Sequence, residues 1–88
     1  MLSEIRLTQH AGQKFDILRR HGFPISREQV EQTLLAPDAV WRQEGGRFIA
    51  QKAIGERHVL RVVYRMEADT VIVITFYPGL RERYESDL

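Results

Sequence analysis

Apolar residues between positions 7 and 21 recur every three or four residues, as they do in a helix with one buried stripe. The stripe consists of Leu7, Ala11, Phe15 and Leu18. The pattern predicts a helix over Leu7–His21, with Thr8 as its N-cap and Gly22 as its C-terminal stop. Basic residues in the last turn suit the negative end of the helix dipole.

A second helix is predicted over Arg27–Leu35. Ser26 and Gln29 have the spacing of a capping box, in which each side chain accepts a hydrogen bond from the backbone of the other residue. Pro37 ends this helix, because the residue before a proline avoids the α conformation. The two helices are expected to form an αα-hairpin.

After Pro37 the apolar residues alternate with polar ones, which is typical of strands. A short strand opens at Val40 and Trp41, and three more are predicted over Arg47–Ile54, His58–Met66 and Thr70–Tyr77. Gly45 and Gly46 mark a tight turn, and Pro78 with Gly79 is expected to halt the last strand. The fold class is therefore α+β: one domain over residues 1–88, with two N-terminal helices packed on a four-stranded antiparallel β-meander.

Alternation along the strands sorts their side chains onto two faces. The face expected to pack on the helices holds Leu60, Val62, Ile72, Ile74 and Phe76. The opposite face holds Arg61, Arg65, Thr75 and Tyr77. If Phe48, Ala50 and Lys52 share this face, it is half apolar and edged with cations.

Composition limits the class of protein. The chain has 88 residues, of which 43% are hydrophobic and 28% charged, as in ordinary globular domains. It has no cysteine, which excludes disulfides and thiolate metal sites. No apolar run is long enough to cross a bilayer, and residues 1–6 lack the pattern of a signal peptide. A cytoplasmic protein that does not act in the membrane is expected.

The net charge of +1 conceals an uneven distribution. Between Arg42 and Arg65 six cations face two acidic residues, so the strand region is basic. The cations that a folded-back C-terminal tail would bring together are Arg47, Lys52, Arg61, Arg65, Arg81 and Arg83. Arginine matches phosphate groups, and Tyr77 and Tyr84 offer rings for stacking on unpaired bases. The alternative is that these cations only solvate an open face.

Three histidines carry the candidate acid–base chemistry. His10, near the start of the first helix, is a candidate general acid or base, or else a hydrogen-bonded helix-start residue. His21 suits a helix end, and His58 is expected to be structural. No pair has the close spacing of zinc ligands, so neither a metal site nor a cofactor is expected. The motifs of nucleotide hydrolases and serine hydrolases are also lacking.

Short motifs in a particular order suggest a family. They are Thr8-Gln9-His10-Ala11, Leu34-Leu35-Ala36-Pro37-Asp38, Gly46-Arg47, Leu60-Arg61-Val62-Val63-Tyr64, Val73-Ile74-Thr75-Phe76-Tyr77-Pro78 and Arg83-Tyr84. The series covers Leu7 to Tyr84 and resembles the small bacterial and archaeal family called domain of unknown function 4258. That family is similar to the RelE/ParE-like toxins and to the wider barnase-EndoU-RelE-like RNase group. The chain departs from it in having Lys14 where an arginine is common.

The resemblance implies a RelE-like fold and a toxin-like endoribonuclease that works without a metal. Carried onto this sequence, the catalytic candidates are His10, Arg47, Arg61, Tyr77 and Arg83, and the RNA-binding candidates are Lys52, Arg65, Thr75 and Tyr84. His10 or Tyr77 would move protons and the arginines would clamp the phosphate. ParE-like relatives share the fold but act on gyrase. The resemblance therefore leaves two functions open.

The first function is that of a metal-independent endoribonuclease or RNA-binding domain, with RNA as its partner. The alternative is a non-enzymatic interaction domain that uses a sheet edge. Its partner would be an antitoxin-like protein or a second copy of the chain, which pairs with an edge strand through backbone hydrogen bonds.

Overall fold

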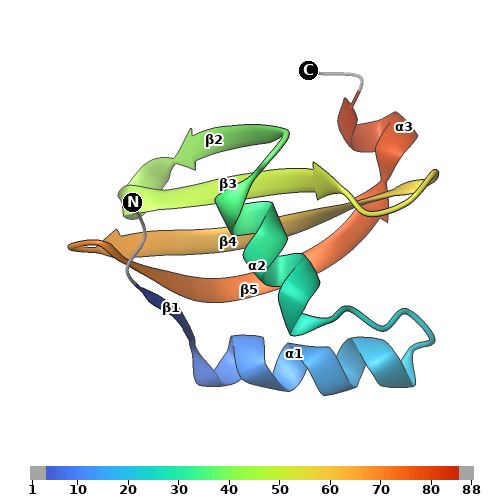
Figure 1. Cartoon of the computed structure of the whole chain (residues 1–88), viewed down its shortest axis with the longest axis horizontal. Coiled ribbons are helices and arrows are strands. Elements are labelled where there is room, and N and C mark those ends of the chain that lie inside the picture. The colour runs from blue at the N-terminus through green and yellow to red at the C-terminus, as the bar shows by residue number, and fades with distance from the viewer. Residues whose placement is uncertain (1–3, 86–88) are drawn as a thin grey trace.

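The computed structural model describes residues 4–85. These residues form three α-helices and a five-stranded mixed sheet with strand order β1-β5-β4-β3-β2 (Figure 1). The elements are β1 (Glu4–Leu7), α1 (Gln9–Arg20), α2 (Arg27–Leu35), β2 (Ala39–Gln43), the 3-10 turn η1 (Glu44–Gly46), β3 (Arg47–Ala53), β4 (His58–Glu67), β5 (Thr70–Leu80) and α3 (Arg81–Tyr84). The first three residues of the N-terminal stretch lie outside the described part. No helix within residues 4–85 is long and apolar enough to span a membrane.

The N-terminal strand β1 was not expected. Its residues alternate between polar and apolar, and Ile5 and Leu7 pack against the hydrophobic core. Glu4 pairs with Thr70 and Leu7 with Val73, so β1 runs parallel to β5. The prediction of a four-stranded antiparallel sheet is therefore wrong. A four-residue strand is too short to give a clear period of two before a strong helical pattern begins.

The predicted first helix is present with a different start. Thr8 caps it, as predicted, and its hydroxyl accepts a hydrogen bond from Ala11 N at 3.1 Å. The helix ends before Gly22, which has a φ of 80° and follows the cap residue His21. The prediction that the helix includes Leu7 is wrong, because that residue pairs with β5.

The second helix has the predicted bounds and the predicted capping box. Ser26 Oγ accepts from Gln29 N at 3.1 Å, and Gln29 Oε1 accepts from Ser26 N at 2.8 Å. Val30 and Thr33 are fully buried on its inner side. The Thr33 hydroxyl donates to Gln29 O, which satisfies its polar group inside the protein.

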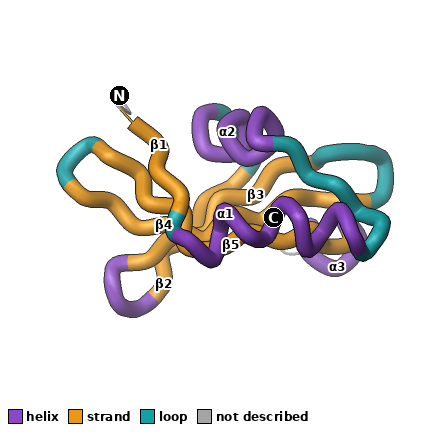
Figure 2. The backbone as a smooth tube through the Cα atoms, turned by 90° about the horizontal axis from the view of Figure 1, so that it is seen from below, coloured by secondary structure: helices purple, strands orange, loops and turns teal. Residues whose placement is uncertain are grey.

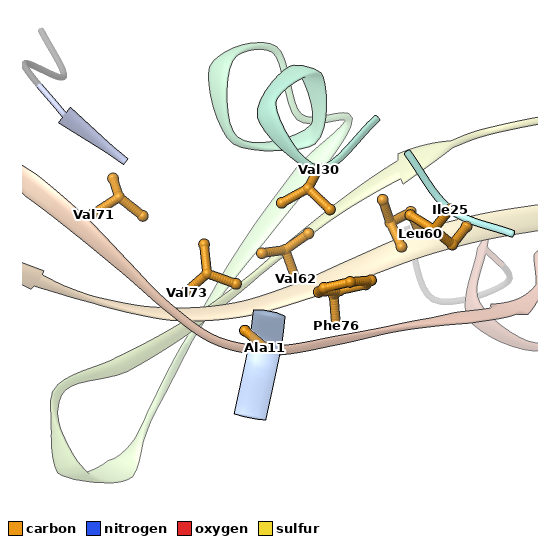
Figure 3. Close-up of a cluster of buried hydrophobic side chains, with 8 residues drawn as sticks. All are labelled: Ala11, Ile25, Val30, Leu60, Val62, Val71, Val73 and Phe76. Atoms are coloured by element: carbon orange, nitrogen blue, oxygen red, sulfur yellow. The ribbon is translucent and has the colours of Figure 1, made fainter. Parts of the chain in front are cut away.

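Helices α1 and α2 pack on one face of the sheet, where the core lies (Figure 3). The buried cluster consists of Ala11, Ile25, Val30, Leu60, Val62, Val71, Val73 and Phe76. The ring of Phe15 on α1 contacts the ring of Phe76, with centroids 4.7 Å apart.

A β-bulge changes the predicted face of β5. Val63 pairs with Thr75, but the next residue, Tyr64, pairs with Val73, so Ile74 is an extra residue on β5. Beyond the bulge Val71 and Val73 point into the core with Phe76. The prediction that Ile72 and Ile74 belong to this face is wrong, because strict alternation does not anticipate an inserted residue.

Strand β3 does not place Phe48, Ala50 and Lys52 on the basic face of the sheet. The residues of β3 paired with the core-facing positions of β4 are Phe48, Ala50 and Lys52. They therefore lie on the helix side of the sheet. The other side carries Ile49 and Gln51, both buried. Each face of β3 mixes apolar and polar residues, so alternation alone does not orient this strand.

Strand β5 continues through Pro78 and Gly79 to Leu80, so the prediction of a halt there is wrong. Its pairing with β1 ends at Val73, and beyond that point β5 is an edge of the described sheet. A proline is tolerated at an edge because its missing N–H costs no ladder hydrogen bond. Helix α3 follows on the side of the sheet opposite α2 (Figure 2).

Candidate nucleic-acid interface

The face of the sheet opposite α1 and α2 carries rows of side chains, because residues paired across strands project to the same side. A row of Ala53, Val59 and Gly79 lies beyond the three successive rows that hold the candidate site residues. The first row is Ala39, Gln51, Arg61 and Tyr77; the second is Trp41, Ile49, Val63 and Thr75; the third is Gln43, Arg47, Arg65 and Ile72. We call this surface the open face. Neighbouring rows are two residues apart along a strand, or about 7 Å. Cations thus stand in the first and third rows, with a largely apolar row between them.

Arg61 is the centre of the first row. Its Nε donates to Tyr77 Oη at 3.2 Å and its Nη1 donates to Gln51 Oε1 at 2.7 Å. The guanidinium carbon lies 5.2 Å from the ring centroid of Trp41 and 4.3 Å from that of Tyr84. Cation–π attraction and two hydrogen bonds therefore fix the orientation of this side chain.

Tyr84 reaches Arg61 because α3 folds back onto the open face. Its ring lies against Gly79, where a Cβ atom would stand 2.2 Å from Tyr84 Cε2. Arg81 holds the start of α3: its backbone N donates to Arg57 O at 2.8 Å and its Nη1 to Gly55 O at 3.1 Å. These contacts fulfil the condition that the tail folds back along the sheet, which the convergence of the cations requires.

Two buried polar atoms of the open face have no hydrogen-bond partner among the described residues. One is Nε2 of Gln51, a side chain that is only 1% exposed, and the other is Nη1 of Arg65. Arg65 also lies directly opposite Arg47, and like charges in that position repel. The ion pair of Arg65 Nη2 with the exposed Glu67, at 2.8 Å, offsets part of this charge. Both orphaned atoms are buried donors, so the preference of the face for negative charge comes from the cations of the first and third rows.

His10 reaches the β5 edge of the open face. Its Nε2 lies 3.1 Å from the hydroxyl of Thr75 in the second row. Thr8 fixes the start of α1 there, since its hydroxyl also donates to Ile74 O at 3.1 Å. Thr75 is two residues from Tyr77 on the same side of β5. The imidazole therefore stands one row away from the Tyr77–Arg61 pair.

A shallow cleft of about 360 Å³ opens beside Arg61. It is lined by Trp41, Arg42, Gln43, Arg61 and Tyr84. Its volume is at the lower end of the roughly 300–1,000 Å³ typical of ligand sites.

The structure brings several predicted site residues together. Arg61 contacts both Tyr77 and Tyr84, and His10 contacts Thr75 in the neighbouring row. These five residues come from α1, β4, β5 and α3, which are separated in sequence and meet only in the folded chain.

Other predicted site residues lie elsewhere. Arg47 and Arg65 are in the third row, about 13 Å along the strands from the first. Lys52 is on the helix side of the sheet, where its Nζ donates to Ala36 O at 2.8 Å. Arg83 lies on α3, next to Tyr84. The expected convergence of all the cations on one cleft is therefore wrong.

Sequence reasoning missed Trp41, Gln51 and Gly79. Trp41 is the single tryptophan of the chain and opens a strand, which was a usable signal. Gly79 marks a close approach by a side chain, but the Pro78-Gly79 pair suggested only a strand end. Gln51 gave no signal, because its burial and its bond with Arg61 exist only in the folded chain.

The remaining histidines have structural contacts. Nδ1 of His21 lies 2.7 Å from Ile17 O at the end of α1, and His58 packs edge-on against Phe23 with centroids 4.6 Å apart. Within residues 4–85 no group of three or more His, Asp or Glu side chains is arranged to hold a metal ion.

Comparison with known proteins returns no match: no family model, no curated protein and no solved structure is similar to the chain. The resemblance to domain of unknown function 4258 thus stays a prediction. The functional proposal that follows depends on the geometry of the open face.

Proposed function

We propose that the open face binds single-stranded RNA and cleaves a phosphodiester held between His10 and Arg61. The observation that carries the proposal is the pair of contacts His10–Thr75 and Tyr77–Arg61 in neighbouring rows of one face. An exposed imidazole thereby lies near a half-buried phenol and an oriented, half-buried guanidinium on the same side of the sheet. These are the groups that a phosphodiester cleavage by the 2′-hydroxyl of RNA requires.

The chemistry assigns one role to each group. His10 removes the proton of the 2′-hydroxyl, and the 2′-oxygen forms a bond to phosphorus while the bond from phosphorus to the 5′-oxygen breaks. Arg61 stabilises the negative charge that develops on the phosphorus oxygens. Tyr77 donates a proton to the leaving 5′-oxygen. The products are a 2′,3′-cyclic phosphate and a 5′-hydroxyl.

The three rows supply the binding energy for a strand of RNA. Arg61 in the first row and Arg47 and Arg65 in the third provide positive charge for successive phosphates. Trp41 in the second row and Tyr84 above the first provide rings for unpaired bases, which stack on aromatic side chains. An alternating arrangement of charge and aromatic surface is typical of proteins that hold single strands.

An RNA cleavage assay tests the proposal. The purified chain is expected to cut a labelled single-stranded RNA in the presence of EDTA and to leave cyclic phosphate ends. His10→Ala should lower the rate about a hundredfold or more. His21→Ala is the matched control, because this histidine lies at the other end of α1, and it should leave the rate unchanged.

Equal rates for the wild type and His10→Ala would contradict the assigned role of His10. The absence of both cleavage and binding at low salt would contradict the function itself.

Recognition of a protein through a sheet edge is a second candidate function. Strand β2 pairs only with β3, and no other described strand covers its outer edge. Val40 on this strand is 46% exposed, and Leu35 at the end of α2 is 59% exposed. A second copy of the chain would extend the sheet here through backbone hydrogen bonds. Val40→Lys should then convert a dimer to a monomer in light scattering, and a wild type that is monomeric at all concentrations would overturn this homodimer.

A further inference from the structure

We infer that the cleft beside Arg61 holds one unpaired nucleobase of the RNA and selects guanine. The inference rests on the proposed function only for the identity of the polymer. The seat itself is derived from the five residues that line the cleft and from the bond of the Gln51 side chain with Arg61.

The aromatic side chains of the cleft define the class of ligand. Trp41 is half-buried and keeps part of its ring exposed at the cleft, and Tyr84 lines the cleft from α3. In the strand order of the sheet, Arg61 on β4 lies between Trp41 on β2 and Gly79 on β5. The ring of Tyr84 packs on Gly79. Flat aromatic surface beside a planar guanidinium is suited to a flat heterocycle. The cleft volume of about 360 Å³ admits a single base.

The hydrogen-bonding groups decide which base fits. A guanidinium has five N–H donors, and the contacts with Tyr77 and Gln51 use two of them, one on Nε and one on Nη1. Three donors remain, one on Nη1 and two on Nη2. One from each nitrogen at the end of the fork matches two adjacent acceptors, and the second Nη2 donor, on the Nε side next to Tyr77, is left for the phosphate. Guanine presents such a pair, O6 and N7, whereas adenine and cytosine present an amino donor at the corresponding position.

Gln51 strengthens this preference. Its Oε1 accepts from Arg61, and this bond of 2.7 Å fixes the angle at which the guanidinium meets the cleft. A base that presents an amino group to the fork of Arg61 leaves the donors of the fork unpaired, which costs binding free energy.

Trp41 makes the seat directly measurable, because it is the only tryptophan of the chain. The wild-type protein is titrated at low salt with the four nucleoside monophosphates while tryptophan fluorescence is recorded. We expect saturable quenching by all four, with GMP binding about tenfold or more tightly than AMP or CMP. Inosine monophosphate keeps O6 and N7 and should bind like GMP. The 7-deaza analogue of GMP lacks N7 and should bind about tenfold more weakly.

Two variants distinguish the effect of the planar donor pair of Arg61 from the effect of its positive charge. Arg61→Lys keeps the positive charge but loses the planar pair of donors, so the preference for GMP over AMP should disappear. Arg27→Lys makes the same chemical change on α2, on the other side of the sheet, and should keep the preference. Circular dichroism spectra confirm that each variant is folded. The two analogue titrations use the wild type and remain decisive if Arg61→Lys does not fold.

The possible results test the guanine seat and the proposed function separately. Equal affinity for the four nucleotides, the absence of quenching, or tight binding of the 7-deaza analogue would overturn the guanine seat. RNA that is cleaved without preference for any base would overturn the seat while the proposed function stands. Selective binding of GMP by a chain that neither binds nor cleaves RNA would support the seat and contradict the proposed function.

Discussion

The ring of Tyr84 lies on Gly79, and a side chain at position 79 would begin 2.2 Å from the Cε2 atom of that ring. The same ring covers the guanidinium of Arg61 at 4.3 Å. The conformation of the C-terminal helix and the shape of the cleft thus depend on a residue that has no side chain.

We expect Gly79→Ala to destabilise the protein by about 1–3 kcal/mol, because the new methyl group forces Tyr84 off the sheet. In a Tyr84→Ala background the same substitution should cost almost nothing, since the obstructing ring is gone. Urea unfolding of the four proteins forms a double-mutant cycle. Equal costs in both backgrounds would show that Tyr84 does not pack on Gly79.

The β-bulge gives a second expectation. Val73 is fully buried in the core, whereas Ile74 is the extra residue of the bulge and is only half-buried. Val73→Thr places a hydroxyl in the core and should cost about 1–3 kcal/mol. Ile74→Thr should cost less than half as much. Both pairs of residues are β-branched, so strand propensity is matched. A larger loss for Ile74→Thr in chemical unfolding would contradict the register.

Burial beside Phe48 and the core raises the pKa of Tyr64 above the ordinary tyrosine value of 10.0. The folded state therefore holds the phenolic proton more tightly than the unfolded state does. This difference in proton binding contributes to the free energy of unfolding. The contribution is fully present below the pKa of Tyr64 in the unfolded state and is lost as pH rises through its pKa in the folded state. Stability should fall in this alkaline window, and Tyr64→Phe should reduce the fall. Unfolding curves at several pH values and the tyrosinate absorbance check both points; an unchanged slope in Tyr64→Phe would contradict them.

The proposed phosphate contacts have a measurable salt dependence. For single strands the logarithm of the binding constant falls with the logarithm of salt concentration with a slope of about −0.7 for each phosphate neutralised. Arg47→Ala should therefore reduce the steepness of the slope by about 0.7. Arg27→Ala removes the same charge from α2, on the other side of the sheet, and should leave the slope unchanged. Identical slopes for the two variants would exclude Arg47 from the RNA contact.

Local chemistry allowed much of the fold to be predicted. The cap at Thr8, the capping box at Ser26 and the glycine turn at Gly45 each depend on a few neighbouring residues, and all three are present. The parallel strand β1 could not be predicted in the same way, because its partner Thr70–Val73 is more than sixty residues away. The bulge at Ile74 likewise depends on how β4 and β5 meet.

The candidate site was predictable in part for the same reason. The chemistry of His10, Arg61 and Tyr77 is visible in the sequence, but their spacing depends on the register of three elements. The alternation along β3 does not show that Lys52 lies on the helix side of the sheet or that Gln51 is buried on the other side. The contact of Tyr84 with Arg61 required knowing that α3 turns back, which no local pattern indicates.

The most direct test of the RNA-binding face uses two side-chain signals in nuclear magnetic resonance. The indole N–H of Trp41 is unique in the chain, and the Nε–H of Arg61 is fixed by its bond to Tyr77. On addition of a short single-stranded RNA at low salt, both signals should shift, while the backbone amides of Glu28 and Gln32 on α2 should not. Shifts confined to α2 or to the outer edge of β2, with Trp41 and Arg61 unchanged, would contradict RNA binding by the open face.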